Sequence, residues 1–239
     1  MVPKVFLGTS PFIGAGQFGE KSVEYYRKFY LHPENITRII VKSWDLGVKG
    51  IQLLPLPPLV EAVRKAIEKG SCPPFILGSV GIDNLRSEVK ALEGLGAAGA
   101  LLHARIADTL SVSIIESALR FLEERFKFTG FVTHFPRRTL SWFSTSGLKA
   151  RIALVPFNRM GYMFDDDLDS IVRAIRSFNG IVLAKKVLAA GRLKPREALE
   201  FVSSEKSIYG VVLGVASEEE AEETLGAALK IYREKDQLK

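Results

Sequence analysis

Short apolar runs alternate with longer amphipathic stretches along the whole chain. The clearest examples are residues 181–193, IVLAKKVLAAGRL, and residues 211–225, VVLGVASEEEAEETL. Each begins with an apolar run too short to be a helix, reaches a small or charged turn, and continues at helical spacing. Strand, turn and helix in this order form the repeating unit of a parallel α/β fold. The pattern therefore predicts a parallel sheet whose working residues lie in the turns after the strands.

Eight such units follow one another along the chain. We expect strands at 4–8, 50–54, 75–80, 99–103, 130–133, 150–155, 180–185 and 209–214. We expect helices at about 33–46, 59–69, 84–95, 109–126, 136–143, from 165 onward, 194–203 and 217–234. The apolar runs are nearly continuous, as expected for strands whose two faces are both covered. Because 239 residues match the roughly 250 typical of one eight-fold barrel, we predict a single (β/α)8 TIM barrel spanning residues 1–239. A doubly wound open sheet is the alternative.

Composition adds limits to this picture. Hydrophobic residues make up 47% of the chain, and no apolar run approaches the roughly 20 residues that span a bilayer. Cys72 is the only cysteine, so no internal disulfide can form and a cytoplasmic location is expected. The net charge of +6 comes from Lys and Arg that stand beside Glu on the predicted helices, which favours solvated helix faces over nucleic-acid binding. Abundant Lys, Arg and Glu with few Gln, Cys and Met also suggest a heat-adapted protein.

The segment between the first strand and the first helix, residues 11–32, is long for a loop in a barrel and rich in aromatic residues. A loop of this kind lies at the barrel mouth, so we expect it to act as a lid over the site. The alternative is that its rings complete the hydrophobic core.

Polar side chains gather in the turns after the predicted strands, which is where barrel enzymes place their active sites. For catalysis we select His103, His134 and Lys185, because imidazole and amine groups can transfer protons or act as nucleophiles. For ligand binding we select Arg137, Arg138, Asn158, Lys186, Arg192 and Ser217. A mouth ringed by basic groups attracts an anionic small molecule, which is the ligand we predict. The alternative is that several of these side chains point to solvent.

The histidines and lysines have other interpretations as well. His103 and His134 could bind a metal with Asp83 or Asp108 as the third ligand, or could bond to backbone groups, and we expect no metal site. Lys185 could form a Schiff base or pair with an anionic ligand. Because consecutive strand residues face opposite sides, we expect only one of Lys185 and Lys186 to point into the barrel.

Several familiar motifs are missing from the sequence, namely a GxxxxGK[ST] loop, GxGxxG after a strand, HExxH and paired CxxC. Other segments resemble the aldo-keto reductase superfamily: LGTSPFIGAGQFG at 7–19, LLH at 101–103, AKKVLAAGRLKPREALEFV at 184–202 and GVVLGVASEEEAEETL at 210–225. The last two are similar to the iron–sulfur-associated and archaeal branches. The resemblance implies a (β/α)8 barrel and, in ordinary members, NADPH-dependent carbonyl reduction.

The resemblance also implies positions for a catalytic tetrad of Asp, Tyr, Lys and His. This chain keeps the histidine, as His103, while the other positions fall on Gln52, near Pro57 and near Ser79. Without the tyrosine no acid protonates the carbonyl oxygen. The loop that holds a cofactor phosphate in the family reads ASEEE, residues 216–220, where glutamates repel an anion although Ser217 and helix N–H groups could accept one.

Three functions remain open from the sequence. The first is an enzyme or binding protein for a small anionic metabolite, without tetrad-based carbonyl reduction. The second is an NAD(P)H-dependent oxidoreductase with a replaced tetrad, and the third is a non-catalytic barrel scaffold whose mouth is plugged by aromatic residues of 11–32 and 160–164. We expect no nucleic-acid or membrane partner, and the sequence assigns no oligomeric state.

Overall fold

The computed structural model describes residues 1–70 and 75–237, so Cys72 lies outside the described residues. The strands in this part of the chain are β1 (Val5–Gly8), β2 (Gly50–Leu53), β3 (Phe75–Val80), β4 (Gly99–Leu102), β5 (Phe128–Val132), β6 (Ile152–Pro156), β7 (Ile181–Lys185) and β8 (Gly210–Leu213). Each strand begins and ends within two residues of its predicted range.

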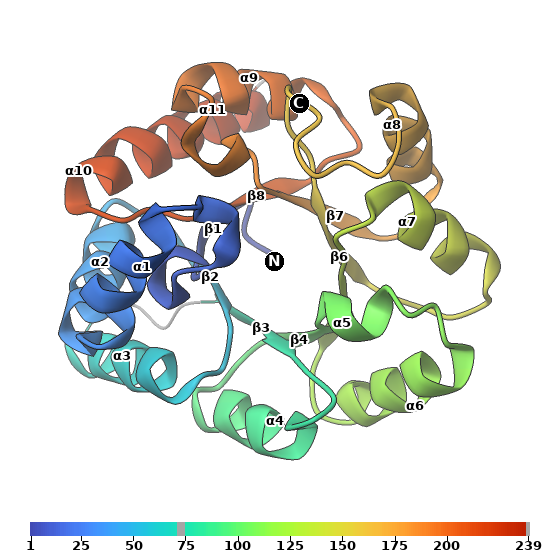
Figure 1. Ribbon diagram of the computed structural model, residues 1–239, viewed down its shortest axis with the longest axis horizontal. Helices are drawn as coiled ribbons and strands as arrows, with labels where there is room; N and C mark the ends of the chain where they lie inside the picture. The colour runs from blue at the N-terminus through green and yellow to red at the C-terminus, as the bar shows by residue number, and fades with distance from the viewer. Residues whose placement is uncertain (71–74, 238–239) are drawn as a thin grey trace.

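The strands pair in chain order and the sheet closes on itself. Every pairing is parallel, and β1 closes the barrel against β8, where Val5 lies opposite Val211. Figure 1 shows the strands around a central axis and the helices as an outer ring. The predicted (β/α)8 TIM barrel is confirmed, and the open-sheet alternative is wrong.

The outer ring consists of helices that follow each strand. They are α2 (Pro33–Asp45), α3 (Pro57–Glu68), α4 (Leu85–Gly94), α5 (Ala104–Ala107), α6 (Val112–Glu123), α7 (Pro136–Thr145), α8 (Leu168–Ser177), α9 (Pro195–Ser204), α10 (Glu218–Glu220) and α11 (Gly226–Gln237). Four of them, α2, α3, α7 and α9, begin with proline. Proline suits this position because the first N–H groups of a helix have no partner within the helix.

Two of the predicted helices differ from the expectation. The predicted helix 109–126 is shortened to α6, and a short helix that was not predicted, α5, comes before it. The two are separated where Leu110 adopts a left-handed backbone with φ of 56°. The predicted helix 217–234 is present, but a π-helical turn, η5 (Ala221–Leu225), separates α10 from α11. The first difference matters for the site, because α5 begins directly at His103.

Side chains that point into the barrel form a core of their own, separate from the core beneath the helices. This inner core contains Phe6, Leu77, Leu101, Val132, Ile152, Leu154, Leu183 and Val212. A Cβ at Gly50 would lie 2.5 Å from the Phe6 ring, so glycine is needed there for the ring to fill the centre. A barrel packed in this way is not a pore, and polar chemistry is confined to its mouth.

Residues 11–32 fold into helical turns, which are η1 (Pro11–Ile13), η2 (Gly16–Phe18), α1 (Lys21–Tyr25) and the π-helical η3 (Tyr26–Tyr30). Phe12 and Phe29 are fully buried, with ring centroids 5.0 Å apart. Phe18 and Tyr25 line a cavity at the mouth. The segment therefore completes the core and also covers one side of the mouth, and its movement as a lid stays a prediction.

Candidate functional site

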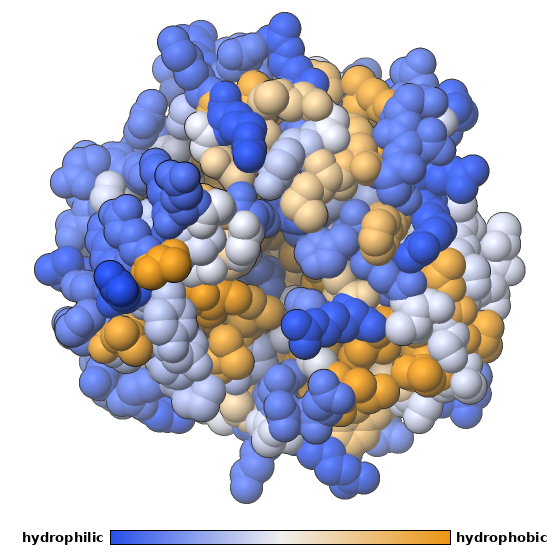
Figure 2. All heavy atoms as spheres, in the orientation of Figure 1, coloured by the Kyte–Doolittle hydropathy of each residue, from blue (hydrophilic) through white to orange (hydrophobic). Residues whose placement is uncertain are grey.

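A cavity of about 800 Å³ opens at the carboxyl-terminal mouth of the barrel. Strand residues such as Gln52, Ser79 and Leu154 line it, together with residues of 11–25 and of the turn after β7. Figure 2 shows this face of the molecule, which is hollowed at its centre. The cavity has the size of a typical small-molecule site. The mouth is therefore open, unlike the plugged mouth expected for a scaffold.

A neutral hydrogen-bonded pair lies in the wall of the cavity. Gln52 Nε2 donates to Ser79 Oγ at 2.9 Å, and both side chains are buried. These are the two positions at which the resemblance to aldo-keto reductases expects an aspartate and a lysine. The Gln52 amide and the Ser79 hydroxyl are bonded to each other, and neither group brings a charge to the cavity.

Two lysines meet one histidine on the opposite side of the cavity. Lys185 Nζ lies 3.3 Å and Lys186 Nζ 3.4 Å from His134 Nδ1. Lys185 ends β7 and lies two residues after Leu183 of the inner core, so it faces inward. Lys186 follows with a left-handed φ of 58°, and this turn of the backbone brings its amine to the same histidine. The expectation that only one lysine points into the barrel is wrong, because strand alternation ends with the strand.

Burial and crowding disfavour protons in this cluster. Burial, followed by the charges of Lys185 and Lys186, lowers the pKa of His134 to about 3, so its imidazole is neutral at physiological pH. Burial lowers the pKa of Lys186 to about 8. Burial and then the charge of Lys186 lower the pKa of Lys185 well below its ordinary value. Asp108 opposes both lysine shifts without cancelling them. Neutral amine is therefore present at the mouth at mildly basic pH.

His103 lies beside this cluster, with its ring centroid 6.4 Å from that of His134. It begins α5, and its Nδ1 accepts a hydrogen bond from the Arg105 N–H at 3.2 Å. Nδ1 therefore carries no hydrogen, and the ring hydrogen is on Nε2. Burial, and then the charges of Lys185 and Arg105, lower the pKa of His103. The side chain thus bonds to the backbone, as the alternative interpretation expected, and also lines the cavity.

Asp108 supports this side of the site, although the sequence suggests for it only the role of a metal ligand. Its Oδ2 accepts the His134 backbone N–H at 2.9 Å, and its Oδ1 accepts the hydroxyls of Thr133 and Thr139. These bonds fix the turn that carries His134. The partners lie 25 to 31 residues along the chain, so no local pattern in the sequence indicates them.

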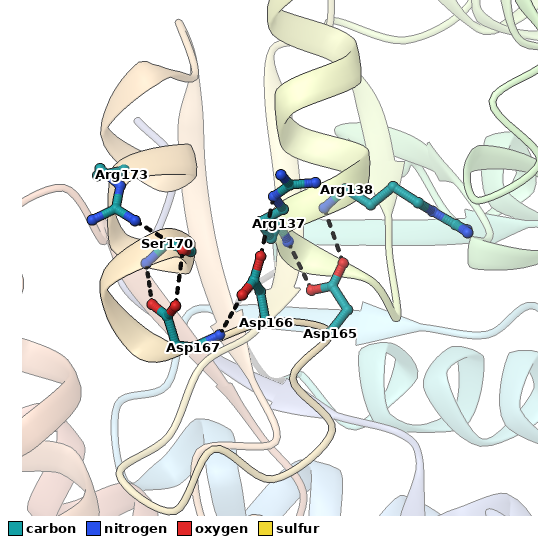
Figure 3. Close-up of polar contacts among 7 residues, drawn as sticks. All are labelled: Arg137, Arg138, Asp165, Asp166, Asp167, Ser170 and Arg173. Atoms are coloured by element: carbon teal, nitrogen blue, oxygen red, sulfur yellow. Dashed lines mark hydrogen bonds and ion pairs between the residues drawn. The ribbon is translucent and has the colours of Figure 1, made fainter.

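Arg137 and Arg138 are engaged by carboxylates of the loop before α8 (Figure 3). The Asp165 carboxylate accepts the backbone N–H groups of both arginines at 2.9 Å each, and so caps α7. The Arg137 guanidinium lies 3.3 Å from Asp166, and the Arg138 guanidinium donates to the Asp108 carbonyl at 2.9 Å. Neither arginine is among the described residues that line the cavity. Protein carboxylates occupy the place where the sequence suggests an anionic ligand.

Of the other expected ligand-binding residues, two bond to the protein backbone and one lines the cavity. Asn158 is buried, and its Oδ1 accepts two backbone N–H groups of the turn that follows it. Ser217 Oγ accepts the Glu220 N–H at 3.1 Å and caps α10. Arg192 lines the cavity with its guanidinium over the Tyr162 ring at 4.6 Å. From the predicted set the structure brings together at the cavity His103, His134, Lys185, Lys186 and Arg192.

Among the described residues, no three His, Cys, Asp or Glu side chains form a group that could hold a metal ion. Within residues 1–70 and 75–237, the helices are too short or too polar for any of them to cross a membrane.

Comparisons of sequence find no relatives: no protein-family profile and no curated protein sequence matches the chain. Many solved structures are similar to this chain, and three of them are described here. PA4992 of Pseudomonas aeruginosa, a proposed aldo-keto reductase, is 19% identical, with a TM-score of 0.66 over 95% of this chain and 90% of that chain. The thermostable aldo-keto reductase Tm1743, in complex with the inhibitor epalrestat, is 18% identical, with a TM-score of 0.63 over 100% and 96% of the two chains.

A third similar structure is the aldo-keto reductase from Klebsiella pneumoniae in complex with NADP and acetate. It is 14% identical, with a TM-score of 0.58 over 97% of this chain and 91% of that chain. Identities this low carry the fold and no residue's role. The predicted resemblance is thus confirmed in three dimensions, and this chain has the barrel fold of the aldo-keto reductases.

Proposed function

We propose that this chain binds and acts on a small anionic metabolite at the carboxyl-terminal mouth of the barrel. The observation that carries the proposal is the pair of lysines at the cavity. Among the described residues, neither Lys185 nor Lys186 has a carboxylate in ion-pair contact, and their common neighbour is the neutral imidazole of His134. A carboxylate or phosphate group of a ligand would supply the missing negative charge.

The position of the lysines makes such an anion worth more here than at the surface. Two unit charges 4 Å apart attract by about 1 kcal/mol in water and by about 4 kcal/mol at the effective dielectric constant of about 20 that describes buried sites in proteins. Lys185 and Lys186 are half-buried in the cavity, whereas Arg137 and Arg138 are exposed and partnered. The anion should therefore select the lysines over the arginines.

Acidic residues on the rim of the cavity opposite the lysines favour one orientation of the bound ligand. Glu20, Glu220 and Glu223 line the cavity on the side of α1 and α10, and all three are exposed to solvent. Solvent weakens their repulsion of an anion at the lysines. We infer a ligand whose anionic group faces Lys186 and Arg192 and whose neutral part lies toward the rim, with the Nε2–H of His103 available as a hydrogen-bond donor.

A nicotinamide cofactor fits this chain poorly, although the Klebsiella pneumoniae structure of the same fold contains NADP. At the turn after β8, Ser217 Oγ accepts the Glu220 N–H, and the Glu220 carboxylate accepts the Ala216 N–H at 2.8 Å. A cofactor phosphate would have to replace both bonds and face the three glutamates that form α10. We therefore derive no hydride-transfer step.

Thermal unfolding with phosphate, sulfate or pyruvate tests the proposal. Stabilisation by a ligand follows RT ln(1 + [L]/Kd), or about 1.4 kcal/mol at ninefold excess over Kd. We expect each of the three anions to raise Tm in the wild type, and the rise to be largely lost in the Lys185→Met, Lys186→Met double variant. Lys90→Met, which removes a charge from the exposed face of α4, should keep the full response.

The outcome that contradicts the proposal is an equal Tm rise in the double variant and the wild type, since the anions would then bind elsewhere. Titration with NADPH and NADH, followed by the fluorescence of Trp44 and Trp142, tests the alternative. We expect no saturable change, and saturation at micromolar cofactor would favour the reductase.

A further inference from the structure

The amine of Lys185 has an environment that anion binding alone does not require. It ends a barrel strand, faces the cavity, and lies beside a neutral imidazole and a second amine. A lysine that only held a charge would be stabilised by a carboxylate neighbour. Here the carboxylate whose charge acts on the amine, that of Asp108, accepts hydrogen bonds from two hydroxyls and a backbone N–H. The surroundings favour an amine that can lose its proton.

We propose that Lys185 is a nucleophile that forms an imine with the carbonyl carbon of an aldehyde or ketone that also carries a carboxylate or phosphate group. This inference rests on the proposed function and names its substrate class. Lysine amines react with carbonyl compounds in this way when a hydrophobic pocket or a second cationic group keeps them neutral. Both conditions are met, because Leu154 and Val212 of the inner core line the cavity and Lys186 is the second cation.

The two lysines have different parts in the reaction. Lys185 extends from the strand end into the cavity, and burial together with the charge of Lys186 favours its neutral form. Lys186 is held by a left-handed backbone and retains its proton to a pKa of about 8, so it is the charged group that pairs with the anionic end of the substrate. The substrate anion must then lie only a few bonds from the carbonyl.

The reaction balances without an oxidant or reductant. The Lys185 nitrogen forms a bond to the carbonyl carbon, while the carbonyl oxygen accepts a proton and becomes the hydroxyl of a carbinolamine. The hydroxyl then leaves as water, taking a second proton, and a C=N bond replaces the C–O bond. The two protons that the Lys185 nitrogen gives up in these steps are the two that the oxygen takes up, so no further reactant is needed, and His134 Nδ1 lies 3.3 Å from the nitrogen.

Two other features of the molecule support no proposal of a site. An apolar groove between α4 and α6 includes Ile82, Ile114 and Phe121, but nothing in the structure shows what covers it. Trp44 Nε1 and Tyr232 Oη are buried without a hydrogen-bond partner among the described residues, and neither residue lines that groove or the cavity at the mouth.

Reductive trapping tests the inference. The full chain is incubated with pyruvate at about pH 8, reduced with borohydride, digested, and mapped by mass spectrometry. We expect one reduced pyruvate per chain at Lys185, at least about tenfold more than at Lys90, because each unit by which a pKa is lowered raises the neutral amine fraction about tenfold. Adducts on Lys186, or spread evenly over surface lysines, would overturn the assignment.

Two variants separate this inference from the proposed function. Lys185→Arg cannot form an imine, so it should lose the adduct, while the Tm rise of the wild type with phosphate reports the proposed function on its own. Lys186→Met should keep the adduct at Lys185 but need several-fold more pyruvate. If phosphate stabilises the wild type and no adduct forms, the inference fails and the proposed function stands. If neither occurs, both fail. Mapping the wild-type adduct requires no variant to fold.

Discussion

Two basic clusters lie close to the barrel mouth, and they differ in what faces them. The arginine cluster, Arg137 and Arg138, is bound by Asp165 and Asp166 from the next loop. The lysine cluster, Lys185 and Lys186, shares the imidazole of His134, Lys186 also donates to Met163 Sδ, and within the described part of the chain neither lysine pairs with a carboxylate. The two clusters look alike in the sequence, because each is a pair of adjacent basic residues at or soon after the end of a strand. Basic residues therefore indicate an anion site only when the neighbouring carboxylates have been placed.

The clusters also differ in backbone strain. Arg137 and Arg138 lie in the first turn of a regular helix. In the lysine cluster, Lys186, Ala189 and Ala190 all have left-handed backbones, at φ of 58°, 47° and 58°. Each such residue destabilises the fold by roughly 1–2 kcal/mol, and strain of this kind persists where surrounding structure imposes it, most often at functional sites.

The largest effect on stability is expected at Asp108, the carboxylate behind the lysine cluster. Asp108→Ala removes the acceptor of two hydroxyls and of the His134 N–H, and among the described residues only the Thr133 hydroxyl keeps another acceptor, Thr139 Oγ1 at 3.0 Å. We expect the free energy of unfolding to fall by about 2–4 kcal/mol in urea denaturation. The exposed Asp166, which pairs with Arg137, is the matched control, and Asp166→Ala should cost less than about 1 kcal/mol. Equal losses in the two variants would show that the Asp108 contacts are weak.

A smaller effect is expected at Asp165, which caps α7 in the arginine cluster. Asp165→Ala should lower the free energy of unfolding by about 1–2 kcal/mol, because two helix N–H groups lose their acceptor. The same change should convert the arginine cluster into an anion site. Phosphate should therefore raise the Tm of Asp165→Ala more than that of the wild type. An unchanged phosphate response would mean that the carboxylate does not keep anions from the arginines.

The smallest effect concerns the strain at the lysine cluster. Ala190→Gly should raise the free energy of unfolding by about 0.5 kcal/mol. Glycine adopts φ of 58° without the steric penalty, and this gain is partly offset because glycine loses more conformational entropy on folding. Ala198→Gly, in the interior of α9, is the control and should lower it by about 1 kcal/mol or more. Chemical denaturation measures both variants. If Ala190→Gly destabilised the protein, the left-handed backbone at Ala190 would not be strained.

The barrel and the meeting of His103, His134 and Lys185 could be predicted from the sequence because both follow from strands. Apolar runs mark the strands, and closure places their last residues around one opening. The direction of Lys186 could not be predicted, because it depends on a left-handed residue just beyond the strand. Nor could the binding of Arg137 by Asp165, 28 residues away, since a loop conformation decides it.

We propose that Lys186 binds the anion while Lys185 reacts as a neutral amine, and the pH at which each lysine loses its proton is the sharpest test of this division. Competitive labelling with acetic anhydride at a series of pH values, read by mass spectrometry, gives the pH at which each amine becomes reactive. We predict that Lys186 becomes half-reactive near its pKa of about 8 and that Lys185 becomes reactive at a pH well below the ordinary lysine range. The Tm rise with phosphate should decline as the pH rises through about 8, because Lys186 loses its charge. If Lys185 and Lys186 became reactive at the same pH as the exposed Lys90, the lysine cluster would be an ordinary surface pair, and the roles proposed for both lysines would be contradicted.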